Sequence, residues 1–194
     1  KDGTLPDVDA RIVCFELKTG KVVWQTEDEV FGTWLSYSEE YDVLVEAGRV
    51  ARDTLLDEPK GMRAFRANNG VVMWRDRSYL GPAMIHGDTI LKDRSACDLI
   101  TGEAKMRSDP LTGDSIPWEW IRNYGCNTPM ASKHLMTFRS GAAGYFDLAN
   151  DGGTGNFGGF RSSCTNNLVV AGGVLCAPDY TRTCTCSYQN QSSV

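Results

Sequence analysis

The sequence has no long apolar run and no excess of positive charge. Its longest nearly apolar stretch, residues 168–177, is about half of the roughly 20 residues that a membrane-spanning helix needs, and two glycines interrupt it. The 25 aspartates and glutamates outnumber the 20 lysines and arginines, so the net charge is -5. These features exclude a membrane span and disfavour a broad electrostatic contact with nucleic acid.

The signatures of common catalytic sites are also missing. The chain has only two histidines, and it has no GxSxG, HExxH or P-loop motif, so serine hydrolases, zinc proteases and nucleoside triphosphatases lack their defining parts. Residues 153–158 match the dinucleotide fingerprint GxGxxG. That fingerprint functions only where a strand turns into a helix, whereas the residues that follow have loop and strand composition. A nucleotide site is therefore disfavoured.

A motif recurs in the first part of the chain. Residues 14–24 align without gaps on residues 64–74, so Trp24 and Trp74 are separated by one 50-residue step. In both copies a glycine lies four positions before the tryptophan, in the dipeptide Thr-Gly or Asn-Gly. Such dipeptides tolerate positive φ in a tight hairpin turn, and the flanking valines and aromatic residues suit half-buried strands. Each copy therefore predicts a strand, a turn and a second strand.

Two weaker copies follow. Residues 96–106 keep the Thr-Gly turn and place Met106 at the tryptophan position, and residues 145–151 keep only the aromatic and acidic positions. Further strand candidates lie between the copies, at residues 42–46, 83–91, 134–139 and 167–176. About four strands per 32 to 50 residues is the repeat of a β-propeller blade.

The sequence thus predicts an all-β fold, a β-propeller fragment of about four four-stranded blades. The fragment is predicted to form a single partial domain. Its approximate blades are residues 1–48, 49–90, 91–140 and 141–194.

The pattern of residues 15–24 resembles the blade signature of the PQQ-binding-like (quinoprotein-like) β-propeller repeats. It combines an apolar pair, an acidic residue, leucine, Thr-Gly-Lys, two valines and tryptophan. The stretch from residues 122–126 through 137–143 to 183–188 resembles the late blades of large, secreted bacterial proteins of that group. The resemblance implies a partial propeller that starts inside one blade and stops inside another, in a secreted or periplasmic protein. It also implies that Trp24 and Trp74 pack between adjacent blades as structural residues.

Quinoprotein dehydrogenases with a similar fold hold PQQ with a calcium ion, acidic and amide ligands, a catalytic aspartate and usually two adjacent cysteines. This sequence has no Cys-Cys pair. The weak candidates for oxygen ligands of calcium are also good turn residues: Asp147, Asn150, Asp151 and Asn156. We therefore expect no cofactor and no metal. The alternative is a fragment of a PQQ-dependent quinoprotein oxidoreductase with calcium, whose site is completed by missing blades or a second subunit.

Five of the seven cysteines lie between residues 126 and 186. Cys184 and Cys186 are too close in sequence to bridge each other easily, so each should seek a distant partner or a common metal. Cys126 and Cys164 are the candidate disulfide partners, in keeping with a secreted protein. A thiolate metal site and reduced, buried thiols are the alternatives.

The predicted function is that of a non-catalytic propeller module, a binding or assembly scaffold for a protein or carbohydrate ligand. An open half propeller would expose an apolar blade face and strand edges, which favour association. We therefore expect self-association through these edges, as a homodimer of about eight blades. A monomer with a self-covered edge is the competing outcome.

Overall fold

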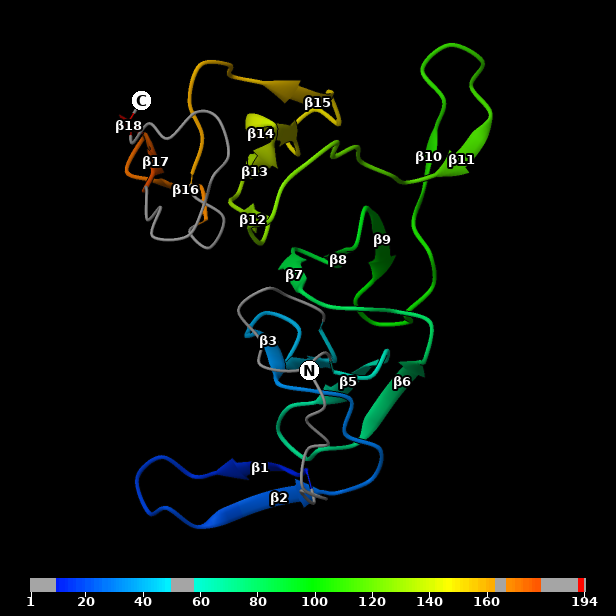
Figure 1. The fold of residues 1–194 in the computed structure, drawn as a ribbon. Coiled ribbons are helices and arrows are strands. Elements are labelled where there is room, and N and C mark those ends of the chain that lie inside the picture. Colours follow the sequence, from blue (N-terminus) through cyan, green and yellow to red (C-terminus); the bar gives the residue numbers. More distant parts are fainter. Residues whose placement is uncertain (1–9, 50–57, 163–166, 179–191, 194) are drawn as a thin grey trace, which may run out of the picture. The chain divides into compact units, whose positions relative to one another are not determined.

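The computed structural model describes residues 10–49, 58–162, 167–178 and 192–193. In these ranges the backbone forms β-strands and turns, without an α-helix (Figure 1). Strands within each sheet are antiparallel, and each pairs with its neighbour along the chain. The prediction of an all-β fold is confirmed. Among the described residues there is no helix with the length and apolar character needed to cross a membrane.

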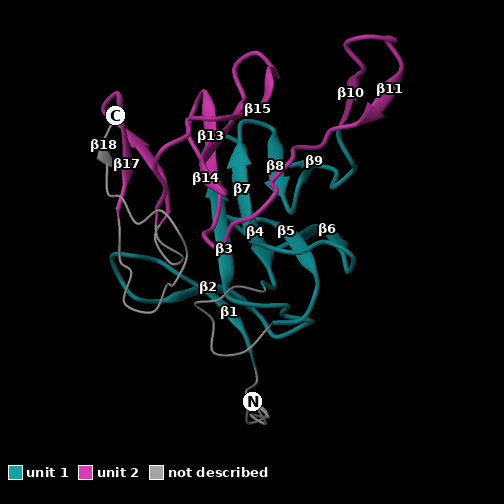
Figure 2. Ribbon diagram, turned by 45° about the horizontal axis from the view of Figure 1, so that its top comes forward, with its two compact units in different colours: residues 1–50, 54–105 teal, residues 51–53, 106–194 magenta. Residues whose placement is uncertain are grey.

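The strands gather into two compact units, which Figure 2 shows in different colours. Unit 1 comprises residues 1–50 and 54–105, and unit 2 comprises residues 51–53 and 106–194. The sequence predicted a single partial domain. It stays a prediction, because each sheet is formed by strands that are neighbours in the chain and so fits either one domain or two.

Unit 1 contains three sheets. The first pairs β1 (Ile12–Phe15) with β2 (Val22–Thr26). The second has the order β3 (Trp34–Ser38), β4 (Val43–Ala47), β5 (Met62–Arg66) and β6 (Val72–Asp76). The third has the order β7 (Ala83–His86), β8 (Thr89–Lys92) and β9 (Ser95–Asp98), and a bridge from Cys97 to Ala104 extends it.

Unit 2 also contains three sheets. The hairpin β10 (Met106–Ser108) and β11 (Ser115–Pro117) forms the first. The second has the order β12 (Met130–Ala131), β13 (Leu135–Ser140), β14 (Ala142–Asp147) and β15 (Gly153–Asn156). The third has the order β16 (Val169–Ala171), β17 (Val174–Ala177) and β18 (Ser192–Ser193).

The repeated motif forms the last two strands of a sheet, not the first two. Its clearest copies lie on β1–β2 and β5–β6, and the stretch between them supplies β3 and β4, which join the second copy. The four-stranded sheets consequently run over residues 34–76 and 130–156, across the predicted blade boundaries at residues 48 and 140. A repeat shows the period of a fold, but not which copy the intervening strands pair with.

A glycine closes each hairpin turn of the motif in the same way. In three turns the N–H of Gly20, Gly70 or Gly102 donates to the carbonyl four residues earlier, at 2.8, 2.8 and 2.9 Å, with φ between 68° and 76°. The turn of β10–β11 has the same bond, from Gly113 to Asp109 at 2.9 Å. This last hairpin was not predicted, although its Thr112–Gly113 dipeptide carries the signal.

The main core of unit 1 lies between its second and third sheets. Alternate side chains of β4 and β5 are fully buried on one face of the second sheet, as expected for strands with one face covered. They pack against buried side chains of β8 and β9 and of the turn that follows. The cluster comprises Val43, Val45, Ala47, Met62 and Ala64 on one side, and Ala83, Ile90, Cys97 and Leu99 on the other.

The two repeated tryptophans join adjacent sheets of unit 1. The indole N–H of Trp24 donates to the carbonyl of Ala67 at 2.7 Å, and that of Trp74 donates to the carbonyl of Leu99 at 3.0 Å. Each ring lies over the turn glycine of the following sheet, where a Cβ on Gly70 or Gly102 would be 2.6 or 2.7 Å from the indole. The turn glycines therefore serve the backbone conformation and also make room for the ring.

This geometry predicts unequal effects for two Gly→Ala substitutions. Gly102→Ala adds a Cβ at positive φ and against Trp74, whereas Gly20→Ala adds one at positive φ with no atom within 4 Å. The strain of positive φ costs about 1 kcal/mol at either site, and overpacking costs about 1–3 kcal/mol more at Gly102. Urea unfolding followed by circular dichroism checks the difference; equal losses would contradict the described tryptophan contact.

Candidate functional site

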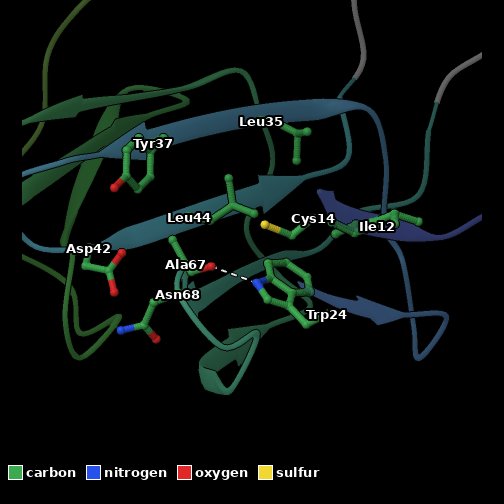
Figure 3. Close-up of a pocket in the computed structure, with 10 residues that line it drawn as sticks. Ile12, Cys14, Trp24, Leu35, Tyr37, Asp42, Leu44, Ala67 and Asn68 are labelled. Atoms are coloured by element: carbon green, nitrogen blue, oxygen red, sulfur yellow. Dashed lines mark hydrogen bonds between the residues drawn. The ribbon is translucent and has the colours of Figure 1, made fainter. Parts of the chain in front are cut away.

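A pocket of about 400 Å³ opens in unit 1 between the first hairpin and the second sheet (Figure 3). One wall comes from β3 and β4 of the second sheet, through Leu35, Tyr37 and Leu44. We call these three residues the open face. The opposite wall comes from β1 and β2 of the first sheet, through side chains that include Cys14 and Trp24.

The alternation of β3 explains why apolar side chains remain open to solvent. Trp34 and Ser36 point to one side, where both donate to the carbonyl of Ala83, at 2.7 and 2.9 Å. Leu35 and Tyr37 point to the other side, as successive residues of a strand must, and they are 54% and 56% exposed. One face of β3 is thus anchored on β7, and its other face is free.

The equivalent face of the third sheet is covered. One cross-strand row of the second sheet consists of Tyr37 on β3, Leu44 on β4 and Phe65 on β5. The corresponding row of the third sheet includes Ile90 on β8 and Cys97 on β9. Ile90 and Cys97 are fully buried by the second sheet. In the second sheet the row is covered only at its outer end, where the Trp24 ring stacks on Phe65 with centroids 5.9 Å apart.

A buried ion pair lies beyond one end of the open face, on the same side of the second sheet. The carboxylate of Glu46 accepts from Arg63 Nε at 3.0 Å and from the N–H of Gly32 at 2.6 Å, and both charged side chains are fully buried. The Arg63 guanidinium lies over the rings of Phe31 and Phe65, at 5.7 and 4.8 Å. Burial raises the pKa of Glu46, and the Gly32 and Arg63 donors oppose that shift. The pair fixes the segment before β3 over this part of the sheet.

The other end of the pocket is polar. Asp42 and Asn68 lie together there, beside Tyr37 (Figure 3). Asp42 has no ion-pair partner among the described residues. Its counterpart in the third sheet, Asp88, pairs with Lys105 at 3.2 Å. A carboxylate at the end of an apolar groove is suited to a cationic group on whatever binds there.

The pocket has the chemistry of a binding surface. Its polar groups are a half-buried thiol, a phenol, a carboxylate and an amide, from Cys14, Tyr37, Asp42 and Asn68. Histidine does not line it. Over the residues that the structure describes, no group of three or more His, Cys, Asp or Glu side chains is placed to hold a metal ion.

The weak calcium candidates lie in unit 2, at β14 and β15 and the turn between them. Asp147 accepts from the N–H groups of Ala149 and Asn150 at 3.0 and 3.1 Å and from the Asn150 side chain at 3.0 Å. These bonds, led by that of the Asn150 side chain, lower the pKa of Asp147. Asp151 pairs with Arg107 at 3.4 Å, and Asn156 accepts from the N–H of Gly158 at 2.6 Å. These polar groups hold their own turns together.

The disulfide candidates fall mostly outside the described residues. Cys164, Cys184 and Cys186 all lie there. Cys126 is half-buried and forms no disulfide with a described residue. Disulfides among these four cysteines stay a prediction.

The open face was not predicted. A strand was expected at residues 42–46, which correspond to β4, and none at residues 34–38. The alternation of Trp34, Leu35, Ser36, Tyr37 and Ser38 carries the period-two signal of β3. That Leu35 and Tyr37 lie uncovered could not be read from the sequence, because it depends on what stands beside the sheet.

Comparison with known proteins identifies a fold neighbour. No family model and no curated protein matches the chain. Among solved structures, BamB from Moraxella catarrhalis is similar, with a TM-score of 0.51 and 18% sequence identity over 84% of this chain and 48% of BamB. The chain thus spans about half the length of that β-propeller. The likeness and the small antiparallel sheets confirm the predicted fold class, a β-propeller fragment.

Proposed function

We propose that this chain is a non-catalytic propeller module that binds other proteins and acts as an assembly scaffold, in a secreted or periplasmic setting. The observation that carries the proposal is the open face. Leu35 and Tyr37 are more than half exposed on an ordered strand, next to a pocket that is apolar except at one end. Ordered apolar surface rimmed by polar groups is typical of interaction sites. The structural likeness to BamB supports the propeller part of the proposal.

The proposal also expects no cofactor. A quinoprotein would need oxygen ligands for calcium beside PQQ, and the oxygens of Asp147 and Asn156 are engaged in their own turns. These hydrogen bonds support the expectation of no calcium at these residues. Incubation with PQQ and calcium should give no dye reduction with an alcohol or a sugar; PQQ-dependent reduction would favour the oxidoreductase alternative.

Photo-crosslinking tests the binding function directly. A benzophenone amino acid in place of Tyr37, in cells that naturally produce the protein, should yield crosslinks to other polypeptides. The same group in place of Arg94, which is exposed on the β8–β9 turn of unit 1, is the matched control. The proposal fails if position 37 gives no more crosslinked product than position 94.

The predicted homodimer concerns the same surface. Two copies could cover each other's open faces, and sedimentation of the purified chain over a range of concentrations tests this. A second copy is one kind of protein partner. The edge of β1 and the carboxylate of Asp42 discriminate between a second copy and a different protein as the partner.

A further inference from the structure

Among the described strands, β1 is paired along one edge only. Its hydrogen-bonded partner is β2, and no other described strand lies beside it. In the second sheet the equivalent strand, β5, is paired on both sides, with β6 and with β4. A free row of N–H and C=O groups is a template for another strand.

The second sheet shows what fits beside such a strand. β4 lies antiparallel to β5, and its alternate residues Val43, Val45 and Ala47 are fully buried against the third sheet. A strand placed beside β1 in the same way would lie in the pocket. Its alternate side chains would cover the open face, as those of β4 cover β7 and β8. The position therefore suits small or β-branched apolar residues at alternate positions.

The charge of the pocket adds a further requirement. Asp42 lines one end of the pocket, and no described residue forms an ion pair with it. In the third sheet the corresponding carboxylate, Asp88, pairs with Lys105. A basic residue near one end of the added strand would therefore meet Asp42.

A different protein meets these requirements better than a second copy does. The strand that serves as the template, β4, is already a central strand of its own sheet. A second copy also has the same net charge of -5 and an Asp42 of its own. A cationic segment from another protein is attracted where a second copy is repelled.

We propose that the β1 edge and the open face together bind an extended segment of another protein, which joins β1 as an antiparallel strand. The segment has small apolar residues at alternate positions and a basic residue at the end beside Asp42. The inference rests on the proposed function and specifies how the partner is held: main-chain hydrogen bonds give affinity, and the pocket selects side chains.

A labelled peptide provides the probe. It has the sequence of residues 41–49, with Tyr41→Lys, Asp42→Asn and Glu46→Gln in the peptide only, so that its lysine lies on the same side as positions 43, 45 and 47. Its binding is followed by fluorescence anisotropy. We expect saturable binding to the whole chain. Tyr37→Asp in the protein should weaken binding at least about tenfold, because it places a charge in the apolar contact. Leu111→Asp, at a position that is 94% exposed in unit 2, should leave binding unchanged.

Two N-methylated peptides test the strand pairing itself. One has methyl groups on the backbone nitrogens of positions 43 and 45, and the other on those of positions 44 and 46. Because successive N–H groups of a strand point to opposite sides, only one of the two should lose binding.

Three results would overturn the inference. Equal affinity of both methylated peptides would show apolar contact without strand addition, and an absence of peptide binding would show that the site takes no such segment. A dimer that excludes the peptide would show that a second copy occupies the site. None of these results alters the crosslinking test at position 37, so the scaffold function can stand if the strand addition fails.

Discussion

Replacing Glu46 by alanine is expected to destabilise unit 1 by about 3–5 kcal/mol, because the substitution leaves Arg63 as an uncompensated buried charge. Both side chains are fully buried, and their contact is 3.0 Å long. The loss also removes the acceptor for the Gly32 N–H and so loosens the segment before β3. Urea unfolding followed by circular dichroism measures the change.

The double substitution Glu46→Leu with Arg63→Met is the control. Removing both charges and keeping apolar volume avoids the unpaired charge, so this variant should be much closer to the unaltered protein than Glu46→Ala is. If Glu46→Ala costs no more than the double variant, the pair is not the closed, desolvated contact described for this end of the sheet.

The second large effect is expected for Trp74→Ala. The ring fills the space between the second sheet and the turn at Gly102, and it contacts Tyr79 edge-on with centroids 6.4 Å apart. Truncating a large aromatic side chain in such a contact costs about 3 kcal/mol or more. Loss of the hydrogen bond to Leu99 is included in this cost.

Trp74→Phe separates the two contributions. It keeps an aromatic ring between the sheets but has no N–H for the Leu99 carbonyl, so we expect a loss of about 1–2 kcal/mol. Urea unfolding of both variants by circular dichroism provides the comparison. Similar losses for Trp74→Ala and Trp74→Phe would mean that ring packing does not join these sheets.

The hairpins of the fold were predictable because their determinants are local. The motif of a turn glycine, valines and a tryptophan can be recognised at Gly20 and Trp24 and again at Gly70 and Trp74. Both glycines have positive φ in the structure. The predicted intervening strands also appear in the structure, as β4, β7–β8, β13 and β16–β17.

Which strands share a sheet was not predictable in the same way. β4 pairs with β3 and β5, so the intervening strands join the second copy and not β2, and nothing in the repeat itself states that preference. The β10–β11 hairpin was missed for a related reason. Met106 stands at the tryptophan position of the third copy, and a second Thr-Gly turn follows at once, at Gly113.

The candidate site lies beside β1, where the first sheet has no described strand equivalent to β4. Phe65 is covered by Trp24, and the family resemblance implied packing between blades for this tryptophan without naming its partner. Leu35 and Tyr37 are also apolar, but they are exposed because no described strand lies beside β1 to cover them. A sequence pattern records what a strand can pack against, and only the assembled sheets show which of those faces remain open.

Hydrogen exchange at the backbone amides of residues 12–15 tests the central claim most directly. With the residue 41–49 peptide bound, the amides on the free edge of β1 should exchange more slowly, and those of the β10–β11 hairpin should be unaffected, since a new ladder of hydrogen bonds protects only the strand that forms it. Unchanged exchange across residues 12–15 at saturating peptide would contradict the account.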